Sequence, residues 1–227
     1  MKKNILILAA HPDDEVLGCG GTIARYSAEG AFIHVAFLSD GVFSREGNKD
    51  IKDKELSLRR DAAISALKVL GVESISFNNF ADNHMDTIAT IEVAKTIEDL
   101  IQKHKPNVIF THHFGDVNVD HRKVHEATVV ACRSQPNHPV KSILCFEVPS
   151  STEWQLAYSG KAFVPNYFID ISKFLSKKIE SLSKYEYEMR DWPHARSLKA
   201  IEHLAHFRGS TIGVDAAEAF AVGRIIE

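Results

Sequence analysis

The 227-residue sequence is poor in cysteine and has no long apolar run. Its three cysteines, Cys19, Cys132 and Cys145, are odd in number, far apart and outside any Cys-x-x-Cys pair. This usage argues against a disulfide framework and is typical of a reducing compartment, so we expect a cytoplasmic protein. Because a run of about eighteen apolar residues is missing, we expect no membrane-spanning helix.

The sequence also lacks an excess of charge of one sign. It has 27 basic and 30 acidic side chains and a formal net charge of -3 at pH 7. Such a balance gives no global positive field to hold phosphates, so nucleic acid is not expected as a partner. Hydrophobic residues make up 44% of the chain, which is enough for a sizeable core. We therefore expect a soluble globular protein.

Short apolar runs alternate with longer amphipathic stretches through the first 150 residues. The run 5–10 is continuously apolar, as expected for a strand buried on both faces. Further strands are predicted at 32–38, 74–78, 108–111 and 142–148, and helices at 18–28, 55–70, 88–104 and 120–131. This alternation predicts a Rossmann-like, doubly wound α/β fold with a mostly parallel sheet flanked by helices.

The remainder of the chain is predicted to extend the same domain. A strand is expected at 167–171, followed by helices at 174–190 and 196–207. The sequence has no internal repeat, low-complexity segment or linker. We therefore predict one domain over residues 1–227, with a core at 1–150 and a C-terminal helical extension at 151–227.

Polar residues follow two strands that we expect to be neighbours. In a sheet ordered 3-2-1-4-5, the first and fourth strands lie side by side where the winding reverses, and ligands bind beyond their carboxyl ends. The sequence His-Pro-Asp-Asp-Glu (11–15) follows the first strand, and residues 112–121, with three histidines and two aspartates, follow the fourth. The polar segment 41–53 is either a mobile loop over this edge or an ordinary solvated loop.

These residue types favour a catalytic zinc site. Zinc binds imidazole and carboxylate groups, and a catalytic site leaves one position open for water. A second carboxylate beside the ligands would take a proton from that water. A nucleotide site is the competing interpretation, because Gly18-Cys19-Gly20-Gly21 follows the first strand. It fits poorly, since three carboxylates stand at the turn where the dinucleotide fingerprint needs glycines and where pyrophosphate would be repelled.

The motifs together resemble those of the PIG-L/LmbE-like family of zinc-dependent de-N-acetylases. The resemblance rests first on His11-Pro12-Asp13-Asp14-Glu15, followed by glycines, and on Asp120-His121 after the fourth strand. It extends over nearly the whole chain through Arg59-Arg60 and the segments 82–86, 149–154, 193–197 and 217–220. These later motifs are similar to those of a bacterial branch that acts on sugars.

The resemblance implies a role for each residue of the first motifs. His11, Asp14 and His121 would bind Zn²⁺, with Fe²⁺ or another divalent metal as alternatives, and Asp13 would be the general base. The implied reaction is hydrolysis of an N-acetylated amino sugar or sugar conjugate to acetate and a free amine. Two other functions stay open: a zinc amidohydrolase for a non-sugar amide or thiol conjugate, and a metal- or carbohydrate-binding protein with weakened catalysis.

One position departs from the family pattern. Many members have His-Pro-Asp-His where this chain has Asn118-Val119-Asp120-His121, and their first histidine helps to stabilise the oxyanion. Asparagine can donate a hydrogen bond but cannot supply a proton, and loss of one oxyanion donor costs about 10²–10³-fold in rate. We predict that Asn118 has a reduced catalytic role, or that His112, His113 or Asp116 covers it. Asp116 is favoured, either as a support for a ligand or as a substrate-binding group.

Two further residues have open roles. Arg59 is predicted either to bind substrate hydroxyls or a phosphate, or to be a surface arginine on a long helix. Asp120 is predicted either to orient His121 or to cap its helix. A homo-oligomer is also left open, because small α/β enzymes often form symmetric assemblies.

Overall fold

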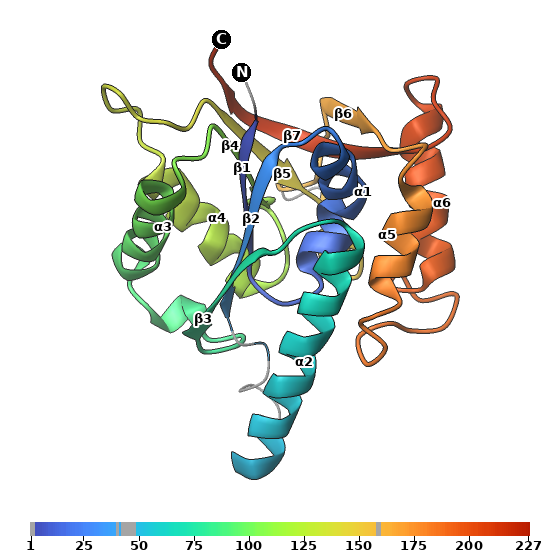
Figure 1. Ribbon diagram of the computed structural model, residues 1–227, viewed down its shortest axis with the longest axis horizontal. Coiled ribbons are helices and arrows are strands. Elements are labelled where there is room, and N and C mark those ends of the chain that lie inside the picture. The colour runs from blue at the N-terminus through green and yellow to red at the C-terminus, as the bar shows by residue number, and fades with distance from the viewer. Residues whose placement is uncertain (1–2, 40, 42–48, 158–159) are drawn as a thin grey trace.

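One seven-stranded sheet, in the order β3-β2-β1-β4-β5-β7-β6, forms the centre of the molecule (Figure 1). The computed structural model describes residues 3–39, 41, 49–157 and 160–227. The strands are β1 (Asn4–Ala9), β2 (Phe32–Ser39), β3 (Ser74–Phe80), β4 (Val108–His112), β5 (Ser142–Phe146), β6 (Tyr167–Asp170) and β7 (Ala217–Ile225). The helices are α1 (Asp14–Ala28), α2 (Lys49–Val69), α3 (Thr90–His104), α4 (Val119–Ala131), α5 (Leu175–Leu182) and α6 (Leu198–Ser210), with short 3₁₀ turns η1 (Met85–Thr87) and η2 (Thr152–Trp154).

The first five strands are parallel, and their order confirms the doubly wound fold expected from the sequence. Strand β1 pairs with β2 on one side and with β4 on the other, with Ile7 opposite Val35 and Phe110. Strand β7 runs antiparallel between β5 and β6. The sheet is therefore mostly parallel, with an antiparallel edge built from the C-terminal part of the chain.

Helices cover both faces of the sheet (Figure 1). Helices α3 and α4 lie on one face, and α1, α2, α5 and α6 lie on the other. Each face buries its own apolar cluster, and the alternating side chains of β1 are divided between them: Ile5 and Ile7 belong to one cluster, Leu6 and Leu8 to the other. This two-sided burial explains why the strand is continuously apolar. In the part of the chain that the structure describes, no helix is long and apolar enough to span a membrane.

Helix α1 begins at Asp14, earlier than the start expected at residue 18. The glycines did not mark its start, because they are packing positions inside it. A Cβ at Gly18 would lie 2.4 Å from Cδ2 of Phe146, so only glycine allows this close approach of the helix to β5. The acidic side chains of Asp14 and Glu15 stand in the first turn, where the helix dipole favours negative charge.

The C-terminal part differs most from the expectation. Helix α5 ends at Leu182, whereas the sequence pattern predicted a helix to residue 190, and the strand β7 was not predicted. Within β7, Glu218 accepts hydrogen bonds from the backbone N–H groups of Gly21 (2.9 Å) and Thr22 (2.7 Å) and pairs with Lys178 at 2.6 Å. These buried polar contacts hold β7 and α5 against α1.

The polar segment 41–53 is only partly described. Helix α2 already begins at Lys49, so the expected loop is shorter than predicted. Residues 42–48 lie outside the described residues. Gly41, just before them, has a positive φ of 70° and lies beside Arg59 at the carboxyl edge of the sheet.

Candidate active site

The turns after β1 and β4 meet at the carboxyl edge of the sheet, where the winding reverses. Because β1 and β4 are hydrogen-bonded neighbours, residues 10–15 and 113–121 leave the sheet side by side. The first turn leads into α1 and the second into α4. The topology therefore brings together the two polar segments identified in the sequence.

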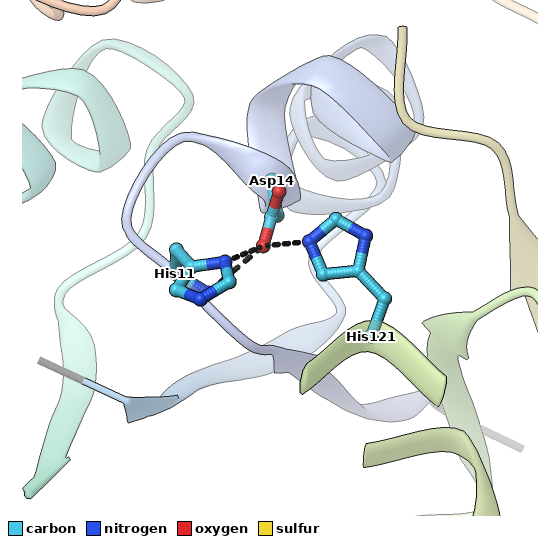
Figure 2. Close-up of side chains that lie close together, drawn as sticks. All are labelled: His11, Asp14 and His121. Atoms are coloured by element: carbon cyan, nitrogen blue, oxygen red, sulfur yellow. Dashed lines mark hydrogen bonds and ion pairs between the residues drawn. The ribbon is translucent and has the colours of Figure 1, made fainter. Parts of the chain in front are cut away.

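His11, Asp14 and His121 point toward one another at this place (Figure 2). Oδ2 of Asp14 lies 3.3 Å from Nδ1 of His11 and 3.2 Å from Nε2 of His121. The backbone N–H of His11 also donates to this oxygen at 2.8 Å, which fixes the turn. One ligand atom from each of the three residues lies within 4.8 Å of the others, a spacing that can hold a single metal ion.

The donor atoms of this group fit a divalent metal. Oδ1 of the buried Asp14 has no hydrogen-bond partner in the protein, and the 3.2 Å contact of Nε2 of His121 with Oδ2 of Asp14 does not have the geometry of a hydrogen bond. Unsatisfied buried polar atoms are rare because each costs free energy, and a ligand is one explanation for such a group. Two imidazoles and one carboxylate, with further coordination open, form a set that suits Zn²⁺.

Asp116 supports His121 from behind. Its Oδ2 lies 3.2 Å from Nδ1 of His121, on the opposite side of the ring from Asp14. Ser151 and Thr152 donate hydroxyl hydrogen bonds to the Asp116 carboxylate, the latter at 2.5 Å, and the backbone N–H of Asn118 donates at 2.8 Å. Although burial opposes ionisation, His121 and these donors hold the pKa of Asp116 well below its usual range. Since Asp116 is fully buried, its position favours orientation of His121 over contact with a substrate.

Asp120 contacts His11, whereas the two roles considered from the sequence were orientation of His121 and capping of its helix. Oδ2 of Asp120 lies 3.0 Å from Nε2 of His11, and Oδ1 of Asp82 lies 3.2 Å from the same nitrogen. The backbone N–H groups of Asn83 (2.7 Å) and Met85 (3.0 Å) donate to the Asp120 carboxylate. Asp120 therefore joins the segment after β3 to the turn after β1.

Asn118 caps α4 and also lines the cleft described below. Its Oδ1 accepts hydrogen bonds from the backbone N–H groups of Asp120 (2.8 Å) and His121 (3.4 Å). Its amide Nδ2 donates to Oδ1 of Asn83 at 3.3 Å. The carbonyl oxygen of the side chain is thus committed to the helix, and the amide group is the part that can donate at the cleft.

Asp13 stands beside the metal-ligand group and is held by Arg196. Nη1 of Arg196 lies 2.9 Å from Oδ2 of Asp13, while its Nε donates to Oγ of Ser150 at 2.6 Å. Asp13 has a φ of 115°, which is strained for a residue other than glycine and is typical of functional turns. Burial raises the pKa of Asp13 to about 7, in spite of the attraction of Arg196.

Glu15 is buried below this turn. Its carboxylate accepts hydrogen bonds from the hydroxyl of Tyr185 at 2.5 Å and from the backbone N–H of Asp13 at 3.0 Å. Burial raises the pKa of Glu15 to about 8. By accepting the hydrogen bond from the backbone of Asp13, Glu15 stabilises the strained turn.

A second arginine lies at the cleft and shares a carboxylate with Arg196. The guanidinium of Arg59 donates to Glu188, and the other carboxylate oxygen of Glu188 lies 3.7 Å from Nη1 of Arg196. The cleft has a volume of about 160 Å³ and is polar throughout, apart from one glycine. Its lining residues are His11, Asp13, Gly41, Arg59, Asp82, Asn83, Asn118, Glu188 and Arg196.

The N-terminal part of the chain, residues 6–132, matches the family model described as PIG-L, a GlcNAc-PI de-N-acetylase. The chain is also 30% identical to an uncharacterized deacetylase, YaiS, from Escherichia coli, over 82% of this chain and 91% of that protein. The chain belongs to the PIG-L family. The family resemblance inferred from the first motifs is thereby confirmed, and with it membership of a family of deacetylases, which hydrolyse amide bonds.

Other members of the PIG-L family cover most of this chain. A diacetylchitobiose deacetylase from Thermococcus kodakarensis is 27% identical over 81% of this chain and 69% of its own length. The solved structure of the N,N'-diacetylchitobiose deacetylase from Pyrococcus horikoshii matches with a TM-score of 0.79 and 21% identity, covering 98% of this chain and 84% of that chain. The latter likeness supports the shared fold.

One relative is named for a different reaction. A 4-oxalmesaconate hydratase from Pseudomonas putida is 26% identical over 80% of this chain and 72% of its own length. Similar chains are therefore named for two reactions of water, hydrolysis of an amide and addition to a double bond.

The histidines proposed as substitutes for the family's oxyanion histidine lie elsewhere. The ring of His112 stacks on that of His121, with centroids 4.0 Å apart, and its Nε2 accepts from the backbone N–H of Ala10 at 2.8 Å. His113 contacts the carbonyl oxygen of Lys161 at 2.9 Å. Neither lines the cleft, so among the residues proposed for this role only Asn118 does.

Five residues that line the cleft were not among the predicted site residues: Gly41, Asp82, Asn83, Glu188 and Arg196. Arg196 stands in the motif 193–197, whose role the sequence left open, and nothing in that motif indicates contact with Asp13. Glu188 was assigned to the interior of a helix, whereas the chain leaves the helix at Leu182 and turns back toward the site. No local sequence signal identifies Glu188.

Proposed function

We propose that this protein is a metal-dependent hydrolase that removes the N-acetyl group from an amino sugar or sugar conjugate. The observation that carries the proposal is the convergence of His11, Asp14 and His121 next to the buried Asp13 in a small polar cleft. The family description and the diacetylchitobiose deacetylase support a sugar as substrate. The products are acetate and a free amine.

His11, Asp14 and His121 would hold the metal, with Asp116 and Asp120 fixing the orientation of the two imidazoles. A bound divalent metal would act as a Lewis acid, lowering the pKa of water and polarising the acetyl carbonyl. The donor set favours Zn²⁺, and Fe²⁺ or another divalent ion could occupy the same ligands.

Asp13 is the general base in this proposal. Arg196 holds Oδ2, so Oδ1 is the oxygen that we assign to proton transfer. It takes a proton from the attacking water as the new C–O bond forms at the carbonyl carbon. It then returns the proton to the nitrogen of the leaving amine as the C–N bond breaks.

The amide of Asn118 is the donor that we assign to the developing oxyanion. Its carbonyl oxygen is fixed by the first turn of α4, which aims the remaining part of the side chain at the cleft. A neutral amide stabilises the oxyanion by hydrogen bonding alone. Proton transfer is therefore left to Asp13.

Addition of water to an unsaturated carboxylic acid is the second candidate, because one relative is named as a hydratase. The same base and metal ligands could activate water for either reaction. The two candidates are separated by their products, since only the deacetylase releases acetate.

We also retain the expectation of a cytoplasmic location. All three cysteines are unpaired and buried, which supports a reducing environment. A homo-oligomer stays a prediction.

The test is acetate release by protein that has been stripped of metal and reloaded with Zn²⁺. The substrates are N-acetylglucosamine, its glycosides and its nucleotide-linked forms. We expect acetate only with metal, and loss of turnover in Asp13→Asn but not in Asp99→Asn, which changes an exposed aspartate on α3. Metal bound at one ion per chain without acetate from any of these sugars would refute the proposed function. Full turnover by Asp13→Asn would refute the role of Asp13.

A further inference from the structure

Both arginines of the cleft are already paired with carboxylates. Glu188 contacts Arg59 and Arg196, and Arg196 also contacts Asp13 at 2.9 Å. The three side chains of the Arg59–Glu188–Arg196 group are mostly buried, with exposed fractions of 13%, 9% and 21%. Water therefore screens these pairs less than it would on an open surface.

The described residues around the cleft carry more negative than positive charge. Asp13, Asp82 and Glu188 line it, and three more aspartates (Asp14, Asp116 and Asp120) lie directly behind. Arg59 and Arg196 are the arginines among the described lining residues. With a bound divalent metal there would be four positive charges. Since the pKa of Asp13 is raised to about 7, this group is only partly ionised at neutral pH, and the five other carboxylates still exceed the positive charges.

This pairing changes what the arginines can recognise. A guanidinium binds phosphate or carboxylate best when its fork of N–H donors is open for a bidentate contact. Here Glu188 accepts a hydrogen bond from Arg59 and lies 3.7 Å from Nη1 of Arg196, which itself donates to Asp13. An incoming anion would therefore have to displace Glu188 or lie next to its charge. Neutral hydroxyl groups meet no such repulsion, and they can use both the remaining N–H donors and the carboxylate oxygens.

We infer that Glu188 determines specificity by keeping Arg59 and Arg196 neutralised, so that the cleft accepts neutral N-acetylated sugars and rejects conjugates carrying a phosphate or carboxylate near the arginines. The inference rests on the proposed function, because it concerns the substrate of the same site. Rejection acts through like-charge repulsion, a form of discrimination that needs no additional contact with the favoured substrate.

The experiment compares N-acetylglucosamine with its 1-phosphate and 6-phosphate. For the zinc-loaded wild type we expect kcat/KM to be at least about tenfold higher for the neutral sugar than for either phosphate. In Glu188→Gln, the ratio should shift toward the phosphates by about tenfold, since one negative charge next to both arginines has been removed. Glu186→Gln, which removes an exposed carboxylate from the same segment, should keep the wild-type ratio.

Binding is measured in parallel on metal-free protein, so that the phosphates gain nothing from the metal itself. The three sugars should show the same order of dissociation constants as of kcat/KM, and Glu188→Asp should retain the wild-type order because it keeps the charge. A wild-type preference for either phosphate, or an unchanged ratio in a folded Glu188→Gln variant that binds zinc normally, overturns the inference. Absence of acetate from all three sugars would count against the proposed function, and the binding order would still decide the inference.

Discussion

His34 gives a prediction about acid stability that can be worked out from its surroundings. It lies on β2, is 2% exposed, and its ring stacks on that of His104 with centroids 3.8 Å apart. Its two ring nitrogens contact the hydroxyl oxygens of Ser74 (2.8 Å) and Ser76 (3.0 Å). Burial, together with the nearby His104 and Lys103, lowers the pKa of His34 from 6.5 to about 4.

The sign of the effect follows from this depressed pKa. Above pH 6.5 the imidazole is neutral in both the folded and the unfolded chain, so it does not change the free energy of unfolding. Between pH 6.5 and 4 the unfolded chain binds a proton that the folded chain does not, so the free energy of unfolding decreases as the pH is lowered. The loss between pH 7 and pH 5 comes to about 2 kcal/mol, and below pH 4 it levels off at about 3 kcal/mol.

Urea unfolding of wild type and His34→Gln at pH 7 and pH 5 measures this loss. The variant should lose about 2 kcal/mol less than the wild type over this interval, because the titrating group is gone. His203→Gln, at an exposed position on α6, serves as the control and should behave as the wild type does. If His34→Gln and wild type lose the same free energy between the two pH values, the reasoning about the buried imidazole is refuted.

Three further outcomes are expected. Asp116→Asn should lower zinc affinity by about 10- to 100-fold in competition with a chelator, because it weakens the support of His121; unchanged affinity would contradict that role. Gly18→Ala should lower the free energy of unfolding by about 1–3 kcal/mol, since its Cβ would overlap Phe146, and a loss within the error of urea titration would argue against this tight contact. Removal of metal with a chelator should lower the Tm and re-addition of zinc should restore it; a Tm that ignores zinc would speak against a metal held in the folded protein.

The sequence was sufficient for those parts of the fold that rest on local patterns. The apolar run at β1 and the alternation up to β5 identified the parallel core, because burial on both faces leaves a continuous apolar signature. The same alternation located the site, since it makes β1 and β4 neighbours and brings the turns of Asp14 and His121 together. These inferences need only the period of the pattern and the rules of connection.

Contacts between distant segments left no such signature. Arg196 and Asp13 are 183 residues apart, and the side chain of an arginine does not reveal its partner. Asn118 and Asp120 are both good helix caps, so the sequence could not tell which of them caps α4 and which contacts another segment. In the fold, backbone N–H groups of the segment after β3 bind Asp120, and Asn118 is left to cap the helix.

The position of β7 has a consequence for how the protein is made. Strand β6 joins the sheet through β7, and α5 and α6 lie between these two strands in the chain. Both helices must therefore be synthesised before β6 has a neighbouring strand. Arg196 leaves the ribosome in the same late interval, long after the turn that carries Asp13. The ion pair between Arg196 and Asp13 can therefore form only near the end of synthesis, after His11, Asp14 and His121 have all emerged.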